Sequence, residues 1–180
     1  YEVPMGTPFA ELLELAGGVR GGRKRKAVIP GGPSVPMVPG AAMMEANLDY
    51  ESLAQTGTML GAGSVIVMDE TTCIVRVVER ISKFFFHESC GQCTPCREGS
   101  GWLHRVVSRI ENGKGRPEDL DTLLGVGSRI EGRTICAFGD AEVAPVTSSI
   151  KHFRDEYEYH IEHKRCMVAP AGRDKVAEAG

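Results

Sequence analysis

The sequence lacks the features that mark membrane-spanning, secreted and nucleotide-binding proteins. It contains no apolar run of about 18 residues, and its first residues do not form a signal peptide. It has neither a G-x-G-x-x-G segment between a predicted strand and helix nor a Walker sequence, so we predict no nucleotide site. Basic residues do not outnumber acidic ones. The formal net charge of -3 argues against a general nucleic-acid-binding protein.

Cysteine is the residue type whose arrangement is most informative. Six cysteines could form a disulfide framework, but such frameworks usually occur in shorter, loop-rich, secreted sequences, so we expect a reducing compartment. Three of the six, Cys90, Cys93 and Cys96, stand at intervals of three in one short loop. Bacterial-type ferredoxin clusters use the same two-residue gaps, whereas zinc sites more often use two separated Cys-x-x-Cys pairs. The triplet therefore favours a [4Fe-4S] cluster over zinc.

The residues around the triplet suit an anionic cluster. Gly91 and Pro95 favour the turns that such a loop must make, and an apolar face from Trp102 to Ile110 predicts a helix directly after it. The cysteines would then lie at a helix N-terminus, where free N–H groups and the helix dipole attract negative charge, with Arg97 as an additional cation. Cys136, which stands in a break between two later predicted helices, is the candidate fourth ligand.

The remaining pattern predicts an α+β fold. A short helix at 7–16 and strands at 27–29 and 64–68 indicate a small α+β unit over residues 1–70. From residue 71 to 180 helical periods dominate, and we expect an all-α helical bundle that holds the iron-sulfur cluster. We expect its helices over the ranges 74–85, 102–110, 120–130, 141–153 and 155–165.

Other interpretations of the cysteines and histidines stay open. A structural four-cysteine zinc module would use the same four ligands, and a thiol-disulfide module would use Cys90 and Cys93, although its usual βαβ context is absent. His160, His163 and Cys166 recur at intervals of three, but such positions drift around a helix, so we interpret them as an ordinary helix face. Cys73 is interpreted as a small core residue.

Three segments together carry a resemblance to a known family. Residues 88–99, 134–140 and 153–156 closely resemble the C-terminal part of the NADH-oxidising flavoprotein subunit of respiratory complex I, the proton-pumping NADH:quinone oxidoreductase. Related subunits occur in NAD-linked hydrogenases and formate dehydrogenases, which are the alternative parent enzymes. The resemblance implies that Cys90, Cys93, Cys96 and Cys136 hold a [4Fe-4S] cluster and that residues 1–70 form a β-grasp-like domain.

The resemblance also implies a function and a setting. The chain would be part of an NADH dehydrogenase, in which the cluster accepts single electrons from reduced FMN and passes them along a chain of clusters towards quinone. FMN and NAD(H) would bind to an N-terminal flavin domain with no counterpart here, so no catalytic residue is assigned. The expected partners are that domain and the neighbouring iron-sulfur subunits of a peripheral arm. That arm would lie on the cytoplasmic side of a bacterial inner membrane or on the mitochondrial matrix side. Because the sequence starts without methionine, we expect a fragment whose β-grasp-like unit is truncated.

Overall fold

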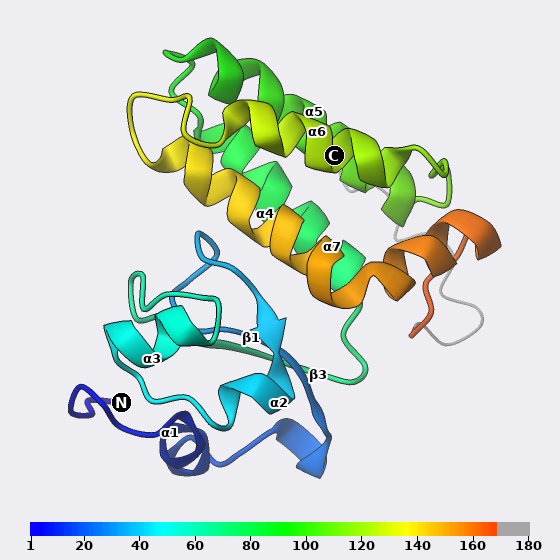
Figure 1. The fold of residues 1–180 in the computed structure, drawn as a ribbon. Coiled ribbons are helices and arrows are strands. Elements are labelled where there is room, and N and C mark those ends of the chain that lie inside the picture. The colour runs from blue at the N-terminus through cyan, green and yellow to red at the C-terminus, as the bar shows by residue number, and fades with distance from the viewer. Residues whose placement is uncertain (169–180) are drawn as a thin grey trace.

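The structure, a computed structural model, describes residues 1–168, and Figure 1 shows a small sheet with short helices beneath a bundle of longer helices. The predicted α+β class is confirmed. In the described range the helices are α1 (Phe9–Leu15), a 3-10 turn η1 (Arg20–Gly22), α2 (Gly40–Met43), α3 (Tyr50–Gln55), α4 (Ile74–Glu88), α5 (Thr94–Glu111), α6 (Asp119–Ile130) and α7 (Phe138–His163). The strands are β1 (Arg25–Ile29), β2 (Val38–Pro39) and β3 (Ile66–Asp69). The division into two domains at residue 70 stays a prediction, and residues 169–180 of the second lie outside the described range.

The sheet separates two apolar layers. Its strand order is β2-β1-β3, and β1 pairs antiparallel with both neighbours, with Val28 opposite Val38 on one side and Val67 on the other. Successive side chains of a strand point to opposite faces. Val28 accordingly packs with the buried residues of α1 to α3, while Ala27 and Ile29 join the core of the helical bundle.

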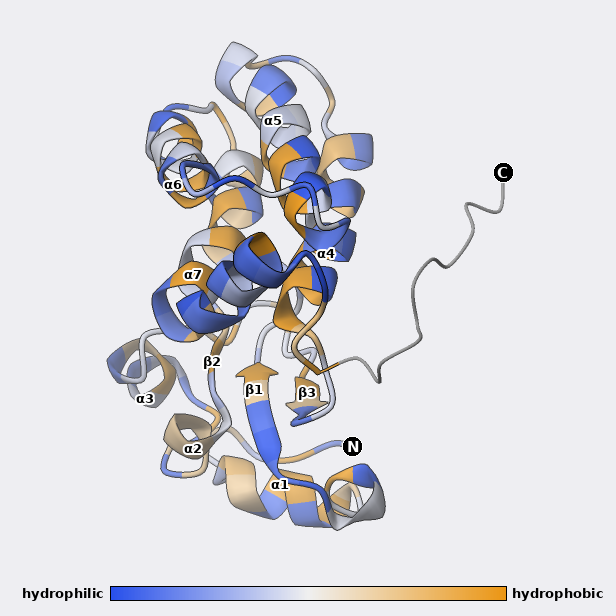
Figure 2. Ribbon diagram, turned by 90° about the vertical axis from the view of Figure 1, so that its right-hand side faces the viewer, coloured by the Kyte–Doolittle hydropathy of each residue, from blue (hydrophilic) through white to orange (hydrophobic). Residues whose placement is uncertain are grey.

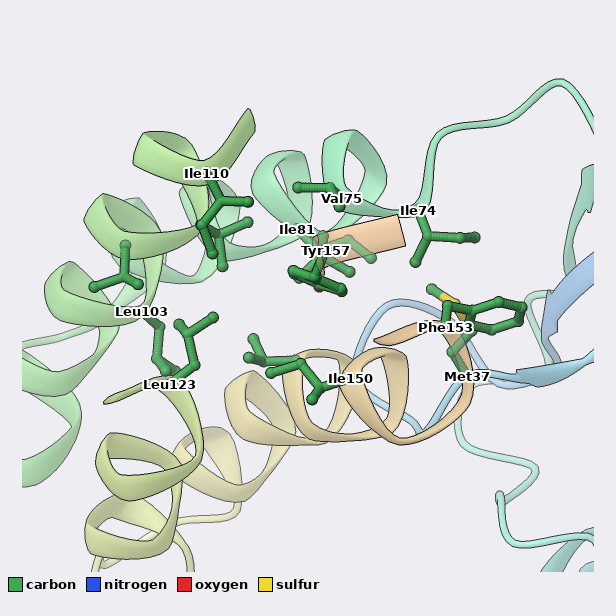
Figure 3. Packing of buried hydrophobic residues seen from close by; sticks show 14 of the residues in the cluster. Met37, Ile74, Val75, Ile81, Leu103, Ile110, Leu123, Ile150, Phe153 and Tyr157 are labelled. Atoms are coloured by element: carbon green, nitrogen blue, oxygen red, sulfur yellow. The ribbon is translucent and has the colours of Figure 1, made fainter. Parts of the chain in front are cut away.

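The bundle consists of α4, α5, α6 and α7. Figure 2 shows that hydrophobic residues lie along one side of these helices, as expected for helices that bury one face. Figure 3 shows the side chains that meet between them, and Leu103, Ile110, Leu123 and Tyr157 are each at most 1% exposed. The bundle is therefore a packed core that fixes how the helix ends lie relative to one another.

Polar contacts join the sheet to the bundle. Lys26 of β1 pairs with the buried carboxylate of Glu156 on α7 and donates to the Thr72 carbonyl at 2.6 Å. The other oxygen of Glu156 accepts from the Ile74 N–H, at the start of α4, at 3.0 Å. The N–H of Met37 donates to Ser148 Oγ at 2.9 Å. The contacts of Lys26 and Glu156 fix the junction between β3 and α4 against α7, and the contact of Met37 ties the segment before β2 to the same helix.

The structure confirms one expectation about the C-terminal helices and differs from another about Trp102. The sequence predicts two helices over residues 141–165, and α7 (Phe138–His163) consists of two helical segments that meet at a kink at Phe153, where φ is -137° and ψ is 36°. Trp102 was expected in the core but is 52% exposed, because the buried face of α5 runs through Leu103, Val106 and Ile110 instead. The Arg105 guanidinium covers the Trp102 ring at 5.2 Å from its centre.

None of the helices between residues 1 and 168 is long and apolar enough to cross a lipid bilayer.

Candidate metal centre

The four candidate cysteines lie at two helix N-termini at one end of the bundle. Cys90 is in the loop between α4 and α5, Cys93 is the N-cap residue of α5, and Cys96 lies in the first turn of that helix. Cys136 comes directly before Ala137, the N-cap residue of α7. The first turn of a helix has N–H groups without intrahelical partners and a positive dipole end. Both helices therefore present positive potential to the cysteines.

The loop that carries Cys136 contacts the loop that carries the triplet. The Ile135 N–H donates to Cys93 Sγ at 3.4 Å across 42 positions of sequence. Burial raises the pKa of the Cys96 thiol, and the nearby Glu142 and Cys136 raise it further. The structure thus brings the Cys136 loop to the triplet, as the sequence predicted for a fourth ligand. That these four cysteines hold the cluster remains a proposal.

Two glycines make this close approach possible. A Cβ added at Gly99 of α5 would lie 2.4 Å from Ile130 Cδ1, at the end of α6 just before the Cys136 loop. A Cβ added at Gly139 of α7 would lie 2.5 Å from Thr134 Oγ1, inside that loop. Carbon atoms in contact normally sit about 3.5–4.0 Å apart. The absence of side chains at Gly99 and Gly139 therefore lets the segment from Ile130 to Cys136 lie directly against both helices.

Hydrogen bonds hold the cysteine loop in shape. The Ser89 hydroxyl lies 3.3 Å from Cys96 Sγ and accepts from the Gly91 N–H at 3.4 Å. The Arg97 guanidinium donates to the Gly91 carbonyl at 2.9 Å and to Thr94 Oγ1 at 3.4 Å. The sequence predicts Gly91 as a turn residue of this loop and Arg97 as a cation beside it, and both lie in this network.

Two supporting contacts were missed by sequence reasoning. Ser89 stands directly before Cys90, so its adjacency to the triplet was a usable signal. Glu142 gave no such signal, because it reaches the site only through the packing of α7 against α5. One of its carboxylate oxygens lies 3.8 Å from Cys96 Sγ, and the other is buried without a hydrogen-bond partner. Burial raises the pKa of Glu142 to about 8.

The donor set fits an iron-sulfur cluster better than one zinc ion. A Zn–S bond is about 2.3 Å long, so two thiolates on one zinc lie within about 4.6 Å of each other. Residues 1–168 contain one group of three or more Cys, His, Asp or Glu residues whose ligand atoms lie within 4.8 Å of one another. That group includes none of the four loop cysteines. Four thiol groups spread more widely around two helix N-termini suit a larger, polynuclear group.

The four thiols differ in access to solvent. Cys96 is buried and Cys93 is half-buried, whereas Cys90 and Cys136 are exposed. Ile135, beside Cys136, is 85% exposed although it is a large apolar residue. A group held here would therefore have one side in the bundle and the other near the surface of the chain.

Fold and cysteine arrangement together define a helical iron-sulfur binding domain. Comparison with known families agrees, because residues 76–160 match the family described as the NADH-ubiquinone oxidoreductase-F iron-sulfur binding region. Over this region the chain is similar to that family. The cofactor that the family implies is a [4Fe-4S] cluster, as the cysteine spacing predicted.

Curated relatives are similar over nearly the whole chain. The chain is 52% identical to the F subunit of NADH-quinone oxidoreductase of Rickettsia typhi over 164 residues, which are 90% of the chain and 39% of that relative. It is 48% identical to the corresponding protein of Mycobacterium tuberculosis H37Rv over 170 residues, 94% of the chain and 38% of the relative. The chain thus spans less than half the length of these relatives.

Solved structures give the same fold. An NAD+-reducing [NiFe]-hydrogenase in the H2-reduced state superimposes with a TM-score of 0.79 at 30% identity, covering 90% of this chain and 27% of the hydrogenase chain. The air-oxidised form superimposes with a TM-score of 0.80 at 29% identity, covering 95% and 28%.

Proposed function

We propose that this chain is the electron-transferring segment of an NADH-oxidising subunit of NADH:quinone oxidoreductase. Cys90, Cys93, Cys96 and Cys136 would hold a [4Fe-4S] cluster, and the observation that carries the proposal is the convergence of their two loops at two helix N-termini. When bound, such a cluster supplies reversible one-electron transfer, here from reduced FMN bound elsewhere in the subunit towards quinone. Identity of 48–52% to NADH-quinone oxidoreductase relatives supports this parent enzyme over an NAD+-reducing hydrogenase, at 29–30%.

The chain's own residues would do three things. The four thiols bind iron as thiolates, whose softness suits iron-sulfur clusters. The helix N-termini of α5 and α7, with Arg97, offset the negative charge of those thiolates. Burial of Cys96 and the hydroxyl of Ser89 control water access and hydrogen bonding at the sulfur atoms, two factors that set the potential of such a site.

The same proposal includes a setting within a larger complex. Exposed Cys90, Cys136 and Ile135 leave one side of the site open to a partner. That surface would face the flavin domain of the same subunit or a neighbouring iron-sulfur subunit of a peripheral arm. The arm would lie on the cytoplasmic side of a bacterial inner membrane or on the mitochondrial matrix side.

The test is metal analysis of anaerobically purified protein. We expect about four iron atoms and four acid-labile sulfides per chain and a paramagnetic signal after dithionite reduction. Cys93→Ser and Cys136→Ser should lose most of the iron, and the Cys93 variant should also lose helicity because cluster binding and folding are coupled. Cys166→Ser, a half-buried cysteine outside both loops, is the matched control and should keep its iron. Zinc without sulfide in the wild type, or unchanged iron in both loop variants, would refute the assignment.

A further inference from the structure

A second group of metal-binding side chains lies at the opposite end of α7. Cys73 is the N-cap residue of α4, His160 lies in the last turn of α7, and Cys166 follows the end of that helix. Their ligand atoms all lie within 4.8 Å of one another. Lys164 ends α7 in the left-handed conformation, with φ 56° and ψ 26°, and from there the chain brings Cys166 back towards His160.

The spacing of these atoms suits one ion. Tetrahedral zinc, with Zn–S bonds of about 2.3 Å and Zn–N bonds of about 2.0–2.1 Å, places its sulfur and nitrogen ligands roughly 3.5 Å apart. Cys73 Sγ and His160 Nε2 are 3.3 Å apart. An ion could therefore bind between them with little movement of α4 or α7.

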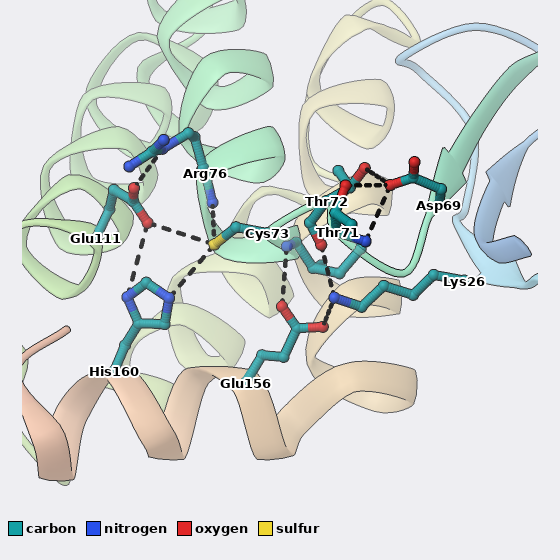
Figure 4. A network of polar contacts seen from close by, with 10 residues as sticks. Lys26, Asp69, Thr71, Thr72, Cys73, Arg76, Glu111, Glu156 and His160 are labelled. Atoms are coloured by element: carbon teal, nitrogen blue, oxygen red, sulfur yellow. Dashed lines mark hydrogen bonds and ion pairs between the residues drawn. The ribbon is translucent and has the colours of Figure 1, made fainter. Parts of the chain in front are cut away.

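The surroundings of His160 suit a metal ligand. It is fully buried, and its Nε2 lies 3.3 Å from Cys73 Sγ. Its Nδ1 has no hydrogen-bond partner and faces Glu111 Oε2 at 3.7 Å. A metal-bound histidine usually donates its second N–H to a carboxylate, which fixes the ring. Figure 4 shows Glu111 on that side of the ring, held by Arg76 at 2.7 Å.

Charge and access also favour a divalent cation. Two thiolates balance the charge of one divalent ion, and Arg76 balances Glu111. A cavity of about 770 Å³ reaches both cysteines and is lined by Arg23, Arg76 and Arg80 among others. Solvent can therefore reach the sulfur atoms from this side.

We propose that Cys73, His160 and Cys166 bind a single zinc ion, separate from the four-cysteine site, with the fourth position open to the arginine-lined cavity. Thiolate and imidazole ligands suit zinc, and three protein ligands with a water or other small ligand make a complete coordination shell. The ion would tie the end of α7 to the start of α4. It would therefore stabilise the junction between the sheet and the bundle and, unlike the loop cysteines, would carry no electrons.

The test measures zinc and iron together in the full chain after incubation with Zn²⁺ and desalting. We expect about one zinc per chain in the wild type, and at least a fivefold loss in His160→Gln and Cys166→Ser with iron unchanged. His163→Gln, an exposed histidine three residues along the same helix, is the matched control and should keep its zinc. Because His160 is buried, its variant could fail to fold. Cys166→Ser, at a half-buried position, keeps the test decisive.

Three results would overturn the proposal. One is a wild type that retains no zinc. Another is zinc that disappears in Cys136→Ser but stays in Cys166→Ser, because that zinc would belong to the loop cysteines. The third is a disulfide between Cys73 and Cys166, seen as a linked peptide in protein purified and digested anaerobically. Since the iron count is read in the same samples, failure of this proposal is distinguishable from failure of the cluster proposal.

Discussion

Replacing Gly99 by alanine tests whether close helix packing builds the cluster site. In an exposed helix interior this change stabilises by about 1 kcal/mol, because alanine is the better helix former. At Gly99 the new Cβ would lie 2.4 Å from Ile130 Cδ1 and 2.7 Å from its Cγ1. Ile130 is only 1% exposed, so its side chain has little room to move away. Overpacking of this kind costs about 1–3 kcal/mol.

We place the cost at the upper end, since two atoms of a buried side chain are involved. Subtracting the helix propensity leaves a net destabilisation of about 2 kcal/mol, which lowers the melting temperature of a chain this size by roughly 4–8 °C. Because Ile130 leads into the Cys136 loop, iron per chain should also fall. Calorimetry and iron analysis of the same anaerobic samples measure both effects.

The matched control is Gly125→Ala on α6, where an added Cβ would meet no atom within 4 Å. That variant should gain roughly 0.5–1 kcal/mol and keep its iron. In the double variant Gly99→Ala/Ile130→Val, the shorter valine side chain lacks Cδ1 and should restore part of the lost stability. The double variant should therefore be less destabilised than the sum of the two single-variant losses. If Gly99→Ala melts above the wild type, as Gly125→Ala should, the packing argument is wrong.

Two further predictions concern stability away from the metal sites. Burial lowers the pKa of His104, so the unfolded chain takes up a proton first as pH falls below the ordinary value of 6.5, and folding stability is lost. His104→Gln should therefore flatten the fall in urea midpoint between about pH 7 and pH 5, and an unchanged slope would contradict this. Asp119, 1% exposed, pairs with Arg109 and accepts from the Arg116 N–H at 2.9 Å. Asp119→Asn should cost about 1.5–3 kcal/mol in urea unfolding, and a loss below about 0.5 kcal/mol would show that the pair contributes little.

The helices around the cysteine loop could be predicted because local signals agree there. The apolar period of α4 and α5 and the proline at the start of α5 depend only on neighbouring residues. The kink of α7 at Phe153 agrees with the predicted boundary between helices at 141–153 and 155–165. The sequence could not show that the segments on both sides of the kink pack into the same core, through Val146 and Ile150 on one side and Tyr157 on the other. That arrangement depends on packing across the bundle rather than on local signals.

For the candidate site, the donor residues could be predicted from sequence but their surroundings could not. The spacing of Cys90, Cys93 and Cys96 restricts the chemistry by itself, since few groups use three thiolates so close in sequence. Cys136 could be proposed because an odd thiol stood in a helix break. Glu142 and Gly99 could not, because each acts through a contact made only once α5, α6 and α7 have packed together.

The pattern His160, His163 and Cys166 shows why regular spacing alone is a weak guide to a metal site. A step of three residues along a helix is a rotation of about 300°, so the side chains of His160 and His163 point about 60° apart. In the structure His160 is buried and His163 is exposed, and the missing partner is Cys73, which lies 87 positions earlier in sequence. Cys166 reaches the group only because α7 has already ended at Lys164. A ligand set that combines the start of one helix, the last turn of another and the segment beyond it has no regular spacing in sequence. It can be recognised only from the folded chain, and zinc analysis of His160→Gln beside His163→Gln tests that distinction directly.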